Sequence, residues 1–194
     1  MTGPDVVRVG FIGAGGNTRS RHIPGFQGIE GVKLLTVANR SAASSQAVAD
    51  EFGIERIASD WRAVLDDPDV DAVCIGTWPY THATMTIAAL EAGKHVLCEA
   101  RMAANAKDAH AMLAASRAHP NQVAQIVPSP MTLPVDRTVI DLIADGYVGQ
   151  IIQVDARASN GNFPAPDGPV HWRHDRDLSG NNIMNMGIWF EGIM

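Results

Sequence analysis

The feature that most constrains this chain is an apolar strand that ends in a glycine turn. Residues 6–12 are mostly apolar, and Gly13, Gly15 and Gly16 follow directly. The first glycine of such a turn permits a tight bend, and the second lets a phosphate group approach bare backbone. A helix that begins here points its free N–H groups at the anion. The pattern predicts a dinucleotide-binding turn, although Thr18 stands where a third glycine or an alanine is usual.

Polar residues near this turn offer further contacts to a dinucleotide. Asn17 and Thr18 open the helix, so they either cap it or donate hydrogen bonds to phosphate. Asn39, Arg40 and Ser41 end the second strand, where an acidic residue would hold the ribose 2′-hydroxyl of NAD. No carboxylate stands here to repel a 2′-phosphate, and a guanidinium can donate two parallel hydrogen bonds to one. We therefore favour NADP over NAD, the alternative being that Arg40 is simply solvated.

The rest of the first two thirds of the chain alternates between strand and helix patterns. Strand patterns occur at 32–38, near 57, and at 70–75, 95–98 and 123–127, and helix patterns at 19–26, 44–52, 61–65, 81–92 and 105–117. Short strands separated by helices are typical of a parallel sheet that helices cover on both faces. We predict an α/β, doubly wound Rossmann domain over residues 1–127. Cys74 and Cys98, late in their strands, are expected to be buried reduced thiols.

A second region follows a proline-rich boundary and covers residues 128–194. A helix is expected at 135–144, and the alternation of apolar and polar residues at 151–157 predicts an antiparallel strand. Residues 183–194 are mostly apolar and predict a buried helix. One helix and one or two strands are marginal by themselves. We therefore expect an incomplete α/β (α+β) second domain, truncated relative to its parent architecture or paired with another copy through an open sheet edge.

Composition limits the partners of the chain. The net charge is −6 and no basic cluster stands out, which argues against nucleic acid and anionic membranes. No apolar stretch approaches the roughly 20 residues that a membrane span needs, and no export signal is evident. His171 and His174 lack a clear carboxylate partner, so no metal site is predicted. We expect a cytoplasmic protein with a small-molecule substrate.

Six segments, in a fixed order along the chain, carry a further signal. They are Val9-Gly10-Phe11-Ile12-Gly13-Ala14-Gly15-Gly16 with Arg21-His22; Asp67-Pro68-Asp69-Val70-Asp71-Ala72-Val73; Thr77-x-Pro79-x-x-His82; Ala89-Leu90-Glu91-Ala92-Gly93-Lys94-His95-Val96-Leu97-Cys98-Glu99; Leu142-Ile143-x-x-Gly146-x-x-Gly149-x-Ile151; and Trp172-Arg173-x-x-x-x-x-Leu178-Ser179-Gly180. Together they resemble the glucose–fructose oxidoreductase/inositol dehydrogenase (Gfo/Idh/MocA) family. The resemblance implies a Rossmann domain, a second domain with a large open sheet, and oligomers that pack through it. It also implies NAD- or NADP-dependent oxidation or reduction of sugars, cyclitols and related polyols, and that most of the usual second domain is missing.

The chain departs from this family at the residues that would do chemistry. The family's Glu-Lys-Pro appears as Glu99, Ala100 and Arg101, so the lysine beside the reacting carbon is absent. The family's Asp-x-Gly-x-His has Asn185 and Trp189 at its acid and histidine. Hydride transfer from an alcohol needs a base for the hydroxyl proton, and alanine, asparagine and tryptophan cannot serve. A catalytic chain must therefore find its base elsewhere.

Candidates for the catalytic positions are few. Arg101 could stabilise a developing alkoxide but is a poor base, because it is effectively never deprotonated. Glu99 matches the acid that the family retains and is expected to contact cofactor or sugar, or else to pair with Arg101. The candidate bases are His171, His174, Tyr147 and Glu191.

The residues after strand 70–75 are expected to line the cofactor, because ligands of open α/β sheets bind at the carboxyl ends of strands. Thr77 and Pro79 are such residues, and Trp78 either stacks on the cofactor or covers apolar surface. His82, at the start of the helix that follows, is also a candidate cofactor-binding residue, the alternative being a structural hydrogen bonder. Three interpretations stay open: an NAD(P)-dependent oxidoreductase, a dinucleotide-binding module without redox activity, and a truncated product that associates through its second domain.

Overall fold

The computed structural model describes residues 6–127, 135–155, 167–169 and 171–180. Its sheet consists of β1 (Val7–Ile12), β2 (Val32–Ala38), β3 (Arg56–Ile57), β4 (Ala72–Ile75), β5 (His95–Cys98) and β6 (Ala124–Ile126). The strands lie in the order β3-β2-β1-β4-β5-β6, and every neighbouring pair is parallel. This arrangement confirms the predicted doubly wound α/β fold, with the order reversing between β1 and β4.

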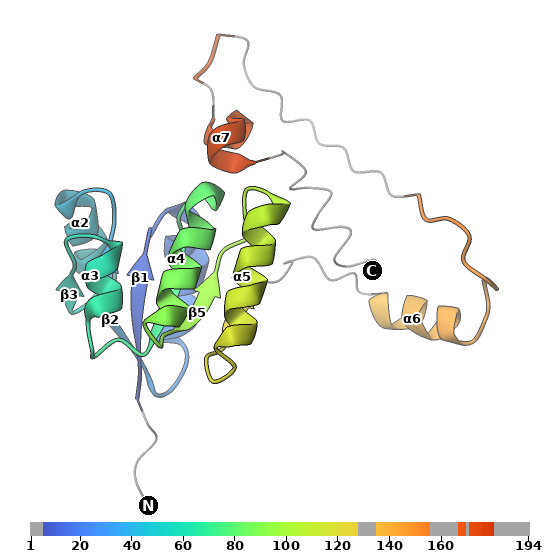
Figure 1. The fold of residues 1–194 in the computed structure, drawn as a ribbon, viewed down its shortest axis with the longest axis horizontal. Helices are drawn as coiled ribbons and strands as arrows, with labels where there is room; N and C mark the ends of the chain where they lie inside the picture. The colour runs from blue at the N-terminus through green and yellow to red at the C-terminus, as the bar shows by residue number, and fades with distance from the viewer. Residues whose placement is uncertain (1–5, 128–134, 156–166, 170, 181–194) are drawn as a thin grey trace, which may run out of the picture.

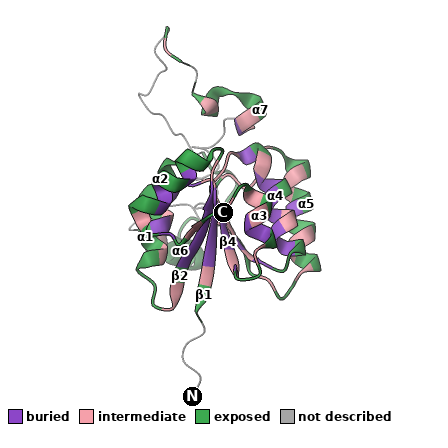
Figure 2. Ribbon diagram, turned by 90° about the vertical axis from the view of Figure 1, so that its left-hand side faces the viewer, coloured by how far each residue is buried: buried purple, intermediate pink, exposed green. Residues whose placement is uncertain are grey.

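Helices cover both faces of the sheet (Figures 1 and 2). They are the π-helical turn Thr18–His22 with α1 (Ile23–Gln27), α2 (Ala42–Phe52), α3 (Trp61–Asp66), α4 (Pro79–Glu91) and α5 (Ala106–Ala118). Figure 2 shows α1 and α2 on one side of the buried strands and α3, α4 and α5 on the other. Neighbouring residues of β1 serve different cores: Phe11 packs on the α1–α2 side and Ile12 on the other. Alternation of side chains along a strand accounts for this division.

Local capping chemistry sets where the helices begin. The Ser41 hydroxyl accepts a hydrogen bond from the Ser44 N–H, so α2 begins at Ala42 rather than at Ser44 as predicted. Asp60 and Asn105 cap α3 and α5 in the same way. Each side-chain oxygen satisfies an N–H that has no partner within the first turn.

The two cysteines are buried and free, as predicted. Burial raises the pKa of Cys98 to about 12 and also raises the pKa of Cys74. Both thiols are therefore protonated at neutral pH, which makes them poor nucleophiles.

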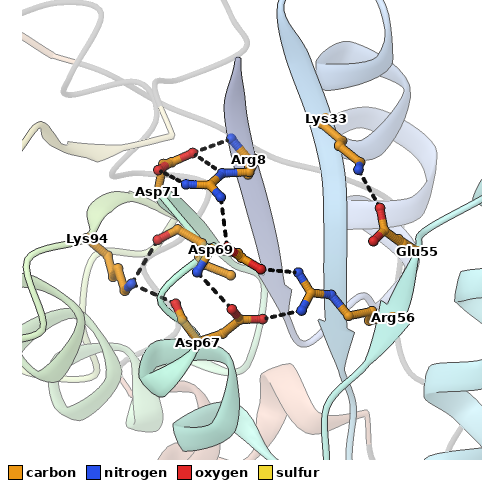
Figure 3. A network of polar contacts seen from close by, with 9 residues as sticks. Arg8, Lys33, Glu55, Arg56, Asp67, Asp69, Asp71 and Lys94 are labelled. Atoms are coloured by element: carbon orange, nitrogen blue, oxygen red, sulfur yellow. Dashed lines mark hydrogen bonds and ion pairs between the residues drawn. The ribbon is translucent and has the colours of Figure 1, made fainter. Parts of the chain in front are cut away.

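Charged side chains form a network at the amino ends of the strands (Figure 3). The Arg8 guanidinium donates to both oxygens of Asp71, at 2.9 and 3.0 Å, and to Asp69 at 3.0 Å. Arg56 pairs with Asp69 at 3.1 Å and Asp67 at 3.4 Å. The Lys94 ammonium, on a buried residue, donates to the carbonyl oxygens of Asp67 and Val70 at 2.8 Å each. This network joins the starts of β1, β3, β4 and β5.

The second region differs in part from expectation. The helix predicted at 135–144 is present as α6 (Asp136–Ala144), followed by a 3-10 turn at Trp172–His174 and by α7 (Arg176–Ser179). The antiparallel strand predicted at 151–157 is wrong over residues 151–155, which are exposed and lie outside any strand. An alternating pattern needs a pairing partner to become a strand, and no described residue pairs with it. Residues 156–157 and the helix predicted at 183–194 lie outside the described residues.

Among the helices that the structure describes, none combines the length and the apolar character that crossing a membrane would require.

Candidate functional site

The carboxyl ends of the central strands meet along one edge of the sheet. Gly13 follows β1, Asn39 follows β2, Gly76 follows β4 and Glu99 follows β5. The strand order reverses between β1 and β4, and the carboxyl edge at such a reversal is where open α/β sheets generally bind ligands. The predicted cofactor residues therefore gather at the place where open α/β sheets bind ligands.

The glycines of the turn have two different tasks. Gly13 has φ +81°, and a Cβ there would lie 2.5 Å from the Thr77 methyl group and 2.9 Å from the Thr77 nitrogen. A Cβ on Gly15 or Gly16 would meet nothing within 4 Å. Gly13 thus lets two turns pack closely, whereas Gly15 and Gly16 leave open space at the start of a helix. Open space beside N–H groups at a helix start is the arrangement that anion sites in general require.

Thr18 stands at the position of the usual third glycine, and Gly76 in another turn leaves room for its side chain. Its side chain is buried and its hydroxyl donates to the Gly13 carbonyl at 3.3 Å. A Cβ on Gly76 would come within 2.6 Å of the Gly13 oxygen and closer still to the Thr18 hydroxyl. The absence of a side chain at Gly76 therefore provides the close helix–strand approach that the third glycine normally allows. The Thr18 hydroxyl therefore makes a hydrogen bond within the turn, which is neither of the two predicted roles.

Glu99 is the centre of a polar cluster beside the glycine turn. The Asn17 side-chain amide donates to its Oε1, His22 Nε2 lies 2.6 Å from the same oxygen, and the Ala100 N–H donates to Oε2 at 2.9 Å. The side chains of Glu99 and His22 are each only 12% exposed. Burial acts to raise the pKa of Glu99, but the hydrogen bonds from His22 and Asn17 outweigh it and hold that pKa below its usual range. Glu99 is thus an ionised carboxylate at neutral pH.

His22 is the residue of this cluster that the sequence analysis did not single out. It lies in the π-helical turn directly after the glycines. Its only sequence signal was its place in the first of the segments that carry the family resemblance. Its contact with Glu99 joins residues 77 positions apart, which no local pattern reveals.

His82 joins the turns that follow β4 and β5. It is fully buried, with Nδ1 at 2.7 Å from the Arg101 carbonyl and Nε2 at 3.0 Å from the Thr77 carbonyl. Burial lowers the pKa of His82, and the backbone hydrogen bonds only partly oppose this shift. Full burial leaves no surface for a ligand, which favours the structural alternative. Pro79 is also buried, at the first position of α4, and the Thr77 hydroxyl accepts from Thr81 at 2.6 Å.

Arg101 faces the second region. The peptide bond between Ala100 and Arg101 is cis, and the Arg101 guanidinium donates to the buried hydroxyl of Ser179 in α7. Burial, followed by the charge of Arg173, lowers the pKa of Arg101. Arginine stays charged even so. The Arg101 guanidinium is thus a cation held against α7, and its alkoxide-stabilising role stays a prediction.

The residues expected at a 2′-phosphate have separate partners. Asn39 Oδ1 accepts from the Ala14 N–H at 2.7 Å and its amide donates to the Ser44 carbonyl at 3.1 Å, while Ser41 caps α2. The Arg40 guanidinium lies over the Trp78 ring, 5.2 Å from its centroid. Arg40 is exposed and remains able to donate to an anion.

The other candidate bases lie apart from the Glu99 cluster or outside the described residues. His171 is exposed, and its Nδ1 accepts from the Arg173 N–H at 3.3 Å. Its ring contacts those of Trp172 and His174, with centroids 5.6 and 6.2 Å away. Tyr147 is 78% exposed. Asn185, Trp189 and Glu191 lie outside the described residues, and within the described ones no group of His, Cys, Asp and Glu is placed to hold a metal.

Comparison with known proteins gives consistent matches. The GFO_IDH_MocA family model, described as an oxidoreductase family with an NAD-binding Rossmann fold, matches residues 7–126. The chain is 31% identical to a levoglucosan dehydrogenase of Pseudarthrobacter phenanthrenivorans over 152 residues, which cover 78% of this chain and 38% of that protein. It is 33% identical to a 1,5-anhydro-D-fructose reductase of Ensifer adhaerens over 180 residues, or 91% and 52% of the two chains.

A solved structure matches over a similar span. The biliverdin reductase of Synechocystis sp. PCC 6803, in complex with biliverdin and NADP⁺, has a TM-score of 0.77 and 26% identity, with 93% of this chain and 54% of that chain covered. The chain thus spans about half the length of this structure and of the reductase, and less of the dehydrogenase.

Proposed function

The chain belongs to the Gfo/Idh/MocA oxidoreductase family, and from this premise we propose that it binds NADP or NAD for hydride transfer to or from a sugar-like or cyclitol substrate. The observation that carries the proposal is the open space over Gly15 and Gly16 at the start of a helix. The relatives named as levoglucosan dehydrogenase and 1,5-anhydro-D-fructose reductase support a sugar-related substrate. The partner is then a small molecule, and neither nucleic acid nor a membrane is needed.

The described residues suggest how a dinucleotide would be held. The pyrophosphate would lie over Gly15 and Gly16, against N–H groups at the helix start. Arg40, which is exposed at the end of β2, would meet a 2′-phosphate, and this favours NADP. Thr77 and Trp78 follow β4, the strand that neighbours β1 in the sheet. When bound, the nicotinamide would supply the hydride acceptor or donor.

His22 and Glu99 are the groups that we propose to handle the proton. Glu99 itself is a weak base because its pKa is held low. It can instead orient His22 through Nε2, and no described residue hydrogen-bonds to His22 Nδ1. A carboxylate that holds one ring nitrogen and leaves the other to accept a proton is the logic of acid–base dyads and triads. Arg101 would stabilise the alkoxide that forms as the proton leaves.

Calorimetric titration with NADPH and NADH, followed by an assay over polyols and keto-sugars, tests this proposal. We expect binding of at least one dinucleotide, and turnover that Glu99→Gln reduces strongly without a matching loss of binding. Gly15→Ala is the matched variant for binding. It adds a methyl group to space that the fold leaves open, so it should abolish dinucleotide binding and barely change stability. A folded protein that binds neither dinucleotide would overturn the proposal.

A second candidate is a dinucleotide-binding protein without redox activity. It is favoured by Ala100 at the family's lysine position and by the three donors that lower the basicity of Glu99. This candidate predicts tight NADPH binding with no turnover on any substrate of the panel. Cofactor-dependent turnover that Glu99→Gln or Arg101→Ala abolishes would exclude it.

Self-association is a further part of the proposal. Helix α6 has no buried residue, and its Val139, Ile140 and Ile143 are 45%, 57% and 42% exposed. Exposed apolar side chains on one helix favour contact with a second copy. Sedimentation velocity on the purified chain tests this, and a single monomeric species at all concentrations would contradict it.

A further inference from the structure

Four side chains from distant parts of the chain form one stack at the carboxyl edge of the sheet. The Arg40 guanidinium lies 5.2 Å from the Trp78 ring centroid, and the Trp78 ring is stacked on Trp172 at 5.9 Å with 20° between the planes. The Arg173 guanidinium covers Trp172 at 4.6 Å. Arg40 follows β2, Trp78 precedes α4, and the other two belong to the 3-10 turn at Trp172–His174. The second region thereby reaches the proposed coenzyme site.

The stack has a chemical consequence for Arg40. A guanidinium that lies over an aromatic ring can still donate its N–H groups to phosphate oxygens. Contact with Trp78 also restricts the Arg40 side chain before a ligand binds, so less conformational entropy is lost on binding. No described acid pairs with Arg40, so its charge is not already neutralised within the described part of the chain.

The residues beside Arg40 are committed to the fold. Asn39 holds the Ala14 N–H and the Ser44 carbonyl, and Ser41 caps α2. These contacts fix the backbone on both sides of Arg40. The direction of the Arg40 side chain is then left to Trp78.

We propose that Trp78, backed by Trp172, is a positioning residue that holds Arg40 ready for the 2′-phosphate and so sets the preference for NADP over NAD. The inference rests on the proposed dinucleotide binding and deepens it. It assigns coenzyme selection to a contact between the Rossmann domain and residues near 172, rather than to the end of β2 alone.

Calorimetry with two coenzyme fragments isolates this effect. 2′,5′-ADP carries the 2′-phosphate and 5′-AMP lacks it, so the ratio of their dissociation constants measures recognition of that phosphate. In wild type, 2′,5′-ADP should bind more tightly, with a stronger dependence on salt. Arg40→Ala should raise the dissociation constant of 2′,5′-ADP about 10-fold or more, as expected when a charged hydrogen-bond donor is lost. The dissociation constant of 5′-AMP should stay nearly unchanged.

Substitutions in the stack should have smaller effects of the same kind. Trp78→Ala should weaken the binding of 2′,5′-ADP by about 2- to 5-fold, the strength of an exposed cation–π contact. Trp78→Phe should keep most of the wild-type affinity. Trp172→Ala should have a smaller effect in the same direction. In an Arg40→Ala background, Trp78→Ala should change nothing further, because Trp78 acts through Arg40.

Arg62 provides a matched control within the same chain. It lies over Trp61 at 4.2 Å, a contact of the same chemistry on α3. Arg62→Ala should leave the ratio of the two fragments unchanged, and melting curves should verify that every variant is folded.

The outcomes separate this inference from the proposed function. If Trp78→Ala weakens both fragments equally, Trp78 contacts the adenine or supports the fold, and the inference is overturned. The same holds if Trp78→Ala weakens 2′,5′-ADP further in the Arg40→Ala background. If the folded wild-type protein binds none of NADPH, NADH and the two fragments, the proposed function itself fails.

Discussion

At the amino edge of the sheet, charged side chains are satisfied by one another and by backbone carbonyls, whereas at the carboxyl edge Arg40 has no acid partner among the described residues and the space over Gly15 is open. At the amino edge, Arg8 meets Asp71 in two parallel hydrogen bonds, and Lys94 donates to two carbonyls (Figure 3). At the carboxyl edge, Arg40 has only ring contacts among the described residues, and Gly15 faces nothing within 4 Å. The same strands thus carry one end that is paired internally and another end at which we propose that a dinucleotide binds.

The difference teaches how a fold can separate stability from binding. Pairs at the amino edge satisfy each other and leave little to offer a ligand. The carboxyl edge leaves backbone donors and the Arg40 guanidinium, whose hydrogen bonds the proposed ligand would complete. Substitutions at the two edges should therefore change different properties of the protein.

The largest effect is expected from Gly13→Ala, set against Gly15→Ala. Gly13→Ala forces a side chain into a left-handed conformation, 2.5 Å from the Thr77 methyl group, and should cost about 2–4 kcal/mol of unfolding free energy. Gly15→Ala should barely change stability but should abolish dinucleotide binding. Thermal unfolding and calorimetry on both variants check this, and equal stability losses would contradict the division of tasks in the turn.

Lys94→Met should act at the amino edge alone. It leaves the Asp67 and Val70 carbonyls without their ammonium donor and should lower the free energy of unfolding by about 1–3 kcal/mol. Urea denaturation measures this loss. The dissociation constant for NADPH should not change, and a clear change would mean that the two edges are coupled.

At the carboxyl edge, Glu99→Gln should lower the free energy of unfolding at neutral pH but not in acid. The pKa of Glu99 in the folded chain is below its ordinary value of 4.5, so its carboxylate stabilises the fold above that value. The stabilisation is lost as the pH falls through the lower, folded-state pKa. We expect the variant to be about 1 kcal/mol less stable at pH near 7, with the difference vanishing in acid. Unfolding curves across this range test it, and a difference that grows in acid would have the wrong sign.

Asp71→Asn should have the smallest effect. The Arg8 hydrogen bond is the main cause that lowers the pKa of Asp71, but both side chains are about one third exposed. Such a pair contributes roughly 0.5–1 kcal/mol and is screened by salt. The stability difference from wild type should shrink when denaturation is repeated at high salt. No dependence on salt would indicate that packing, rather than charge, is lost.

Much of the fold followed from local patterns. Strands at 32–38 and 95–98 were predicted with the bounds that the structure has, because runs of apolar residues between turn signals depend on the segment alone. The strand predicted at 151–157 is wrong over 151–155 because alternation does not supply a partner. Sequence patterns predicted strands correctly within the sheet that helices cover on both faces. They failed where a strand needed a pairing partner from another part of the chain.

The sequence by itself determined the order of strands and helices, the glycine turn and the family of this protein, since each is written in neighbouring residues. Only the tertiary structure brought His22 to Glu99, Thr18 to Gly76, and Trp172 to Trp78. These contacts join segments that lie far apart along the chain, so packing between elements decides them. For that reason the sequence could point to Arg40 and Glu99 as candidate site residues, whereas the contacts that Trp78 and His22 make with them could not be predicted.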